Sequence, residues 1–123
     1  MSLLSEVQLE FPADAGQGTR VSVRVQNAQG GPVVSIAGEL DLTTAPHLRT
    51  VLLKVTAVCP RGCGISLDLS GVTFCDCTGL HVLLSSRQQA LGADRPLAIT
   101  AGSPRVDRLL EITGTAPLFT PAG

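Results

Sequence analysis

The chain has 123 residues, of which 44% are hydrophobic, and it carries a formal net charge of −1 at pH 7. This length and composition are typical of a single domain with its own core. The near-neutral charge and an aromatic content of 2% exclude the basic and stacking surfaces of nucleic-acid-binding proteins. No apolar stretch approaches the roughly 20 residues that a membrane-spanning helix needs, and the N-terminus has no signal-peptide pattern, so we expect a cytoplasmic protein.

The first predicted elements are an N-terminal arm and a β-hairpin. Residues 1–18 hold one apolar stretch, at 7–11, followed by turn-forming residues, and we expect an arm that adds an edge strand or is mobile. Valines alternate with polar residues at 21–25, and an apolar run at 33–38 follows a turn at 27–32. This alternation around a turn predicts a hairpin.

A first helix is predicted over residues 44–57. Thr43 or Thr44 can cap it, and Pro46 is tolerated in the first turn, where its missing N–H has no intrahelical partner. Apolar residues recur at helical spacing and define the inward face: Leu48, Val51, Leu52 and Val55. The residues Cys59-Pro60-Arg61-Gly62 end this helix.

The second half of the chain alternates strands and helices. A short buried strand at 65–69 leads to a second helix that begins at Cys77–Thr78 and closes at Gly92. Its core face is marked by four leucines: Leu80, Leu83, Leu84 and Leu91. A strand at 97–100 follows.

The last predicted elements are a third helix and a final strand. The helix starts at Ser103 with Pro104 in its first turn, and Leu118–Phe119 form the short strand. In the third helix the inward residues are Val106, Leu109 and Leu110. A hairpin followed by alternating helices and strands predicts an α/β fold with a mixed sheet covered by helices.

Several enzyme classes are excluded by missing motifs. The chain has neither the G-x-x-x-x-G-K-[ST] loop nor a G-x-G-x-x-G after a strand, which disfavours nucleotide enzymes. A phospho-aspartate receiver needs a lysine after its last strand, and Lys54 is in the first helix. His47 and His81 fall on exposed helix faces, and a Cys77–His81 pair lacks the orienting partner that a catalytic dyad needs.

The four cysteines, Cys59, Cys63, Cys75 and Cys77, are spaced C-x3-C and then C-x-C. The first pair fits a zinc turn loosely, but the second straddles a strand-to-helix junction where alternate side chains diverge. Disulfides are rare in a reducing cytoplasm, and Cys75 is expected to be a small buried hydrophobe. We therefore expect no metal and no cofactor.

The junction between the buried strand and the second helix is where we expect the function. The first N–H groups of a helix and the positive end of its dipole favour a phosphate or a partner's carboxylate. Asp76, Cys77, Thr78 and Gly79 occupy this junction. The same four residues could also simply cap the helix, with the glycine allowing close packing.

Two stretches together resemble the STAS domain family, in its bacterial anti-sigma factor antagonist branch. They are VSIAGELDLTTAPHL at 34–48 and LDLSGVTFCDCTGL at 67–80, and the resemblance covers about residues 20–119. It implies one STAS domain at 19–120 with a mixed sheet of about four to six strands and helices mainly on one face. It also implies a non-enzymatic switch. An unmodified antagonist of this branch binds an anti-sigma factor, usually also a Ser/Thr kinase of the histidine-kinase-like ATPase class, and frees the sigma factor; phosphorylation ends the binding and a phosphatase restores it.

The family pattern at the switch is Asp-Ser-Ser/Thr-Gly, with the phosphate on the Ser after Asp. Asp76, Thr78 and Gly79 match it, but Cys77 stands at the acceptor position. A thiol is not a substrate of ordinary Ser/Thr kinase chemistry, so either Thr78 is the acceptor or the phospho-switch is missing. By the family arrangement the partner surface comprises eight residues: Glu39, Asp41, Thr43, Asp76, Cys77, Thr78, Gly79 and Leu80.

Two other functions stay open at this point. A thiol-based redox sensor on the same fold could use Cys77, at a helix N-terminus, with Cys75 two residues away. A small phosphotransfer or hydrolase domain is the enzyme alternative, but the sequence shows no convergent set of acid, base and nucleophile. We expect a monomer or weak homodimer.

Overall fold

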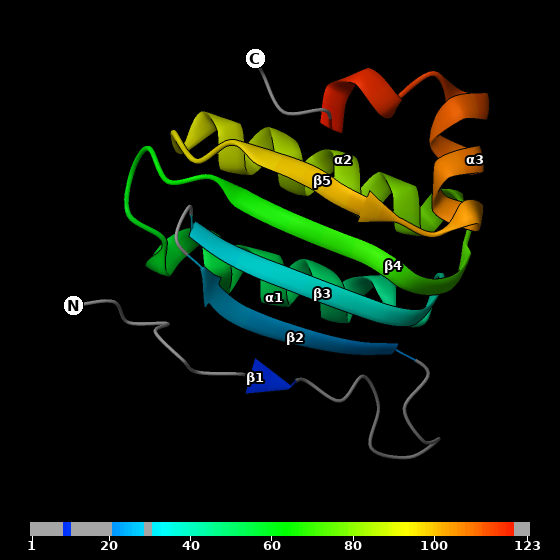
Figure 1. The fold of residues 1–123 in the computed structure, drawn as a ribbon, viewed down its shortest axis with the longest axis horizontal. Helices are drawn as coiled ribbons and strands as arrows, with labels where there is room; N and C mark the ends of the chain where they lie inside the picture. The colour runs from blue at the N-terminus through cyan, green and yellow to red at the C-terminus, as the bar shows by residue number, and fades with distance from the viewer. Residues whose placement is uncertain (1–8, 11–20, 29–30, 120–123) are drawn as a thin grey trace.

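The sheet is mixed and five-stranded, in a computed structural model that describes residues 9–10, 21–28 and 31–119. Its strands lie in the order β1 (Leu9–Glu10), β2 (Val21–Ala28), β3 (Gly31–Leu40), β4 (Ile65–Cys75) and β5 (Leu97–Gly102). The β1–β2 and β2–β3 pairs are antiparallel, whereas β3–β4 and β4–β5 are parallel (Figure 1). The predicted hairpin is confirmed, and within the predicted arm Leu9 and Glu10 form an edge strand; the other residues of 1–18 lie outside the described part.

Two long helices cover one face of this sheet. Helices α1 (Ala45–Val58) and α2 (Cys77–Gly92) both lie behind the sheet in Figure 1, and α3 (Pro104–Thr113) stands at one end beside β4 and β5. The core between helices and sheet contains fully buried residues from every layer: Val23, Ile36, Leu48, Leu67 and Leu83. Because β2, β3 and β4 alternate buried residues with exposed or half-buried ones, their other face stays open to solvent.

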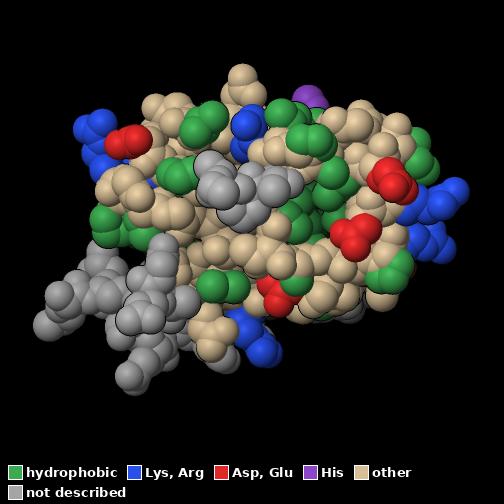
Figure 2. All heavy atoms as spheres, turned by 45° about the horizontal axis from the view of Figure 1, so that its top comes forward, with side chains coloured by type: hydrophobic (Ala, Val, Ile, Leu, Met, Phe, Trp, Pro, Cys, Tyr) green, Lys and Arg blue, Asp and Glu red, His purple; other side chains and the backbone are tan. Residues whose placement is uncertain are grey.

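The edge of the sheet opposite β1 is formed by β5, together with α3 and the 3₁₀ helix η1 (Ala116–Phe119). Its surface carries both acidic and basic side chains. Figure 2 shows acidic and basic side chains interspersed on this side of the molecule, in agreement with the net charge of −1. No helix in the described ranges is long and apolar enough to cross a bilayer.

Three sequence predictions for individual elements are wrong in detail. The strand predicted at 65–69 continues to Cys75, because its polar residues face the open side of the sheet and do not end it. Leu91 is 52% exposed rather than in the core, because the buried stripe of α2 reaches Ala90, and Leu91 lies a further 100° around the helix. The predicted strand at Leu118–Phe119 is part of η1, where Pro117 favours a helical turn and Phe119 is buried.

Candidate functional site

The two motif stretches meet at one end of the sheet. Strands β3 and β4 are parallel neighbours, with Leu40 in register with Cys75, so the loops that follow them leave the sheet side by side. The two loops are also joined directly, since the Asp76 N–H donates to the Leu40 carbonyl over 3.1 Å. The sequence contains both motifs, but only the parallel pairing brings them together.

Gly79 allows the N-terminus of α2 to approach β3 this closely. A Cβ atom at this position would lie 2.9 Å from the Leu40 Cβ, 3.0 Å from the Leu40 carbonyl oxygen and 3.1 Å from the Cys75 Sγ. Such distances are too short for carbon atoms, and a backbone oxygen cannot move aside easily. The glycine therefore fixes the position of the helix terminus against the end of β3.

Asp76 is the N-cap of α2. Its side chain accepts a hydrogen bond from the Gly79 N–H over 3.0 Å, and its carbonyl accepts one from Leu80. Cys77, the first residue of the helix, is exposed, while Thr78 is half-buried. Because the cap satisfies only the later N–H groups, those of Cys77 and Thr78 point out of the helix without an intrahelical partner.

The loop after β3 is organised by Asp41 rather than by a threonine cap. Asp41 Oδ1 accepts hydrogen bonds from the Thr43 N–H (2.9 Å), the Thr43 hydroxyl (2.8 Å) and the Thr44 N–H (3.2 Å). The Thr44 hydroxyl accepts from the Asp41 N–H and donates to the Glu39 carbonyl, over 3.0 and 2.7 Å. Thr44 stands at the N-cap position of α1, but its side chain makes no capping hydrogen bond, so the predicted hydroxyl cap is wrong.

Hydrophobic side chains lie exposed beside these polar residues. Leu42, at the tip of the Asp41–Thr44 loop, is 72% exposed, and Phe74, which pairs with Glu39 across the strands, is 38% exposed. Sequence reasoning missed both, although an isolated leucine between Asp41 and Thr43 is an unusual residue for a polar turn. Of the predicted surface residues, by contrast, Gly79 and Leu80 are buried, so their side chains are not presented to a partner.

The thiols at this end of the sheet differ in their surroundings. Burial, together with the nearby Asp76 and Cys77, raises the pKa of Cys75 to about 11, so that this side chain is a neutral thiol at ordinary pH. Cys77 lies on the surface two residues later. Among the described residues no three of the types His, Cys, Asp and Glu are grouped as metal ligands would be.

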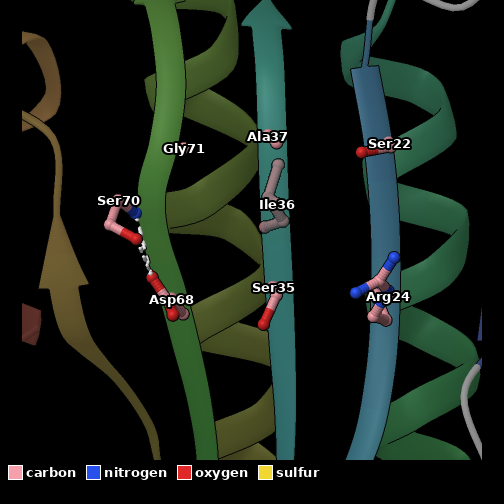
Figure 3. A pocket seen from close by; sticks show the side chains of 8 residues that line it. All are labelled: Ser22, Arg24, Ser35, Ile36, Ala37, Asp68, Ser70 and Gly71. Atoms are coloured by element: carbon pink, nitrogen blue, oxygen red, sulfur yellow. Dashed lines mark hydrogen bonds between the residues drawn. The ribbon is translucent and has the colours of Figure 1, made fainter.

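A separate shallow hollow of about 240 Å³ lies on the open face of the sheet. Figure 3 shows polar side chains from three neighbouring strands around it, with Arg24 on β2, Ser35 on β3 and Asp68 on β4. The hydroxyl and N–H of Ser70 both donate to Asp68 Oδ1 and hold the pKa of this carboxyl below its usual value. The hollow faces away from α1 and α2 and contains neither motif loop.

Comparison with known proteins agrees with this arrangement. A family model described as "Mlab, STAS domain" matches residues 23–120. The anti-sigma-B factor antagonist of Staphylococcus aureus (strain NCTC 8325 / PS 47) is 35% identical over 86 residues, which are 70% of this chain and 78% of that protein. The protein of the same name from Staphylococcus epidermidis is 32% identical over 86 residues, with the same coverage.

Solved structures show the same fold. A crystal structure of an anti-sigma factor antagonist from Mycobacterium paratuberculosis superposes with a TM-score of 0.70 at 28% identity, covering 93% of this chain and 92% of that one. The anti-sigma factor antagonist SpoIIAA in its unphosphorylated form has a TM-score of 0.63 at 20% identity, covering 82% and 88%, and supports the fold alone.

The fold and the paired motif loops thus define a single STAS domain. The chain belongs to the STAS domain family, and its curated relatives are anti-sigma factor antagonists. The predicted family and fold class are confirmed.

Proposed function

We propose that this protein is an anti-sigma factor antagonist, a non-enzymatic switch that binds an anti-sigma factor and so controls sigma-factor-dependent transcription. The observation that carries the proposal is the junction of the two motif loops, in which the Asp76 N–H is bonded to the Leu40 carbonyl over 3.1 Å. This junction places exposed apolar and polar groups together on a fixed support. The names of the relatives point to the same role.

The binding surface in this proposal has an apolar centre and a polar rim. Leu42 and Phe74 supply the apolar area, and the hydrogen-bonded Asp41 loop holds Leu42 in place. The rim consists of the predicted surface residues that are exposed or half-buried: Glu39, Asp41, Thr43, Asp76, Cys77 and Thr78. Such a patch resembles the centre of a protein interface, where a few apolar anchors contribute most of the binding free energy. Gly79 and Leu80 are buried beneath this surface, where they position the N-terminus of α2.

The partner we propose is an anti-sigma factor that is also a Ser/Thr kinase of the histidine-kinase-like ATPase class. Three carboxylates at this end, those of Glu39, Asp41 and Asp76, favour a partner surface with basic groups. A phosphate on Thr78 would add a charge of about −1.5 to −2 beside Asp76 and disfavour docking. With Cys77 at the usual acceptor position, Thr78 is the acceptor that remains, and a phosphatase would reverse its modification.

A redox sensor built on Cys75 and Cys77 has less support. The Cys75 Sγ donates to the Asp76 carbonyl over 3.6 Å, and within the described residues no hydrogen bond joins it to Cys77. Cys77 itself is exposed on the first turn of α2, away from the partly buried Cys75.

The binding proposal is tested by replacing the apolar anchor. Pull-down from native extract, followed by purification of the captured ATPase, supplies the partner for titration. Leu42→Asp should raise the Kd at least tenfold, about 1.4 kcal/mol, with an unchanged Tm because the side chain is 72% exposed.

Ile112→Asp is the matched control, because Ile112 is 68% exposed but lies on α3. It should bind like the wild type. Equal affinity of the wild type and Leu42→Asp would overturn the proposed surface, and a captured partner without an anti-sigma function would overturn the proposed role.

A further inference from the structure

We propose that Cys59 and Cys63 are a redox modification site, at which a peroxide forms an intrachain disulfide. Cys59 follows the last residue of α1, and Cys63 lies two residues before β4. The site is thus at the opposite end of β4 from the motif loops, and it is distinct from the pair Cys75 and Cys77.

The turn between the two cysteines brings their thiols into contact. The Cys63 N–H donates to the Pro60 carbonyl over 3.1 Å, and Gly62 takes a φ of 83° that completes the tight turn. The Cys59 Sγ donates to the Cys63 carbonyl oxygen over 3.7 Å, and burial, followed by the neighbouring Cys63 side chain, raises the pKa of the Cys59 thiol to about 12. The two cysteine side chains thus lie next to each other across one short turn.

The surrounding backbone holds this arrangement in place. The Cys59 N–H is bonded to the Val55 carbonyl over 3.0 Å, and Arg95 Nε donates to the Cys59 carbonyl over 2.5 Å. On the other side, a Cβ at Gly31 would lie 2.7 Å from the Cys63 Sγ, so the β2–β3 hairpin packs directly on that sulfur.

Exposure decides the order of the chemical steps. Cys59 is 1% exposed, but Cys63 is only half-buried and can meet a small oxidant. Hydrogen peroxide transfers one oxygen atom to the Cys63 sulfur, giving a sulfenic acid and one water. Burial raises the pKa of Cys59 to about 12, so its attacking thiolate becomes more abundant as the pH rises. The Cys59 sulfur attacks the Cys63 sulfur and displaces hydroxide, which leaves as a second water with the Cys59 proton. The two thiols lose two protons and two electrons, and the peroxide is reduced to two waters.

The disulfide would act on stability rather than on the proposed binding surface. It would tie the end of α1 to the start of β4 and so restrict the unfolded chain. The 11 residues of β4 separate it from the motif loops by about 30 Å.

Digestion of the full chain gives a direct test, because Arg61 lies between the two cysteines. The protein is treated with one equivalent of hydrogen peroxide, blocked with an alkylating reagent, and cleaved with trypsin. We expect peptides 55–61 and 62–87 joined to each other, with the alkyl group on Cys75 and Cys77 only and a mass two hydrogens below the sum of the two peptides so alkylated. Additional cleavage after Phe74 with chymotrypsin separates Cys63 from Cys75 and Cys77, so the linked residue is identified without any variant.

Thermal unfolding supplies the second measurement. The oxidised wild type should have a Tm higher by about 5 °C than the reduced protein, and dithiothreitol should reverse the change. Cys63→Ser should lose both the joined peptide and the Tm shift, whereas Cys77→Ser should keep both. Peroxide that yields only oxygen adducts on Cys77, or a link to Cys75 or Cys77, would overturn the proposal; if Cys63→Ser does not fold, the wild-type digest still decides.

Discussion

Cys77 and Thr78 are neighbours at the start of α2, but the structure presents them differently. The side chain of Cys77 is exposed on the first turn, while that of Thr78 is half-buried beside it. A kinase that approaches the helix terminus therefore meets a thiol in the accessible position and a hydroxyl in the less accessible one. The departure from the family pattern thus falls at the residue that is best placed for modification.

A Cys77→Ser variant should be a better substrate of the partner kinase than the wild type. It would supply a hydroxyl at the exposed position, next to the N–H groups of the first turn, which favour a phosphate. We expect the wild type to be labelled weakly and only on Thr78. Phosphopeptide mapping after incubation with kinase and ATP measures both.

Thr78→Ala is the control for this experiment. It should abolish the weak wild-type labelling. Stoichiometric labelling of the wild type on Thr78 would mean that the acceptor has moved by one residue. If neither the wild type nor Cys77→Ser is labelled, the idea that Cys77 replaces a former phospho-acceptor is wrong.

At the scale of elements, different hydrogen bonds determine where each helix begins. Asp76 caps α2 and Ser103 caps α3, each through a side-chain hydrogen bond to an N–H three residues later. Helix α1 has instead the Asp41 loop, which satisfies the Thr44 N–H from outside the helix. Asp76 and Asp41 therefore have a structural role whatever they contribute to binding.

Packing of α2 on β3 is tested by Gly79→Ala. The added Cβ would meet the backbone and side chain of Leu40 at about 3 Å, so we expect a loss of about 1–3 kcal/mol in the free energy of unfolding. Gly92→Ala, at the other end of the same helix, has nothing within 4 Å of the new atom and should be neutral or stabilising. Urea unfolding of the two variants gives the comparison, and equal midpoints would refute the packing explanation.

At the scale of the whole molecule, the free energy of unfolding should decrease at alkaline pH. The pKa of Cys75 is raised to about 11 and that of Cys59 to about 12, both mainly by burial, from an ordinary value of 9.0. Above pH 9 the unfolded chain loses these protons while the folded protein keeps them, so the unfolded state binds fewer protons and becomes favoured. The stabilisation is complete below about pH 9 and is lost as the pH rises towards 11.

Urea midpoints at about pH 8 and about pH 10.5 measure this loss. The chain suits the experiment because it has no tyrosine and its single lysine is Lys54, so few other groups titrate in this range. Cys75→Ala should show a smaller decrease than the wild type. A flat profile would contradict the burial of the two thiols.

The sequence by itself determined the features that depend on local patterns. Alternating valines predicted the hairpin, apolar spacing predicted α1 to within one residue and the start of α3, and the junction at Asp76 predicted the start of α2. These features follow from strand and helix periodicity and from capping, which neighbouring residues decide. Asp76, Cys77, Thr78 and Gly79 could be named for the same reason, whereas Glu39, Asp41, Thr43 and Leu80 were named from the resemblance to the family.

Only the tertiary structure decided which parts of the chain meet. The pairing of β3 with β4 brings the end of β3, which leads into the Asp41 loop, next to Asp76, pairs Glu39 with Phe74, and leaves the far side of the sheet open. The contact between Cys59 and Cys63, and the exposure of Leu91 beside the buried Ala90, depend likewise on which elements pack against them. A local pattern states that a side chain is apolar or polar; whether it is covered depends on residues far away in the chain, and the pairing of the sheet brings those residues into place.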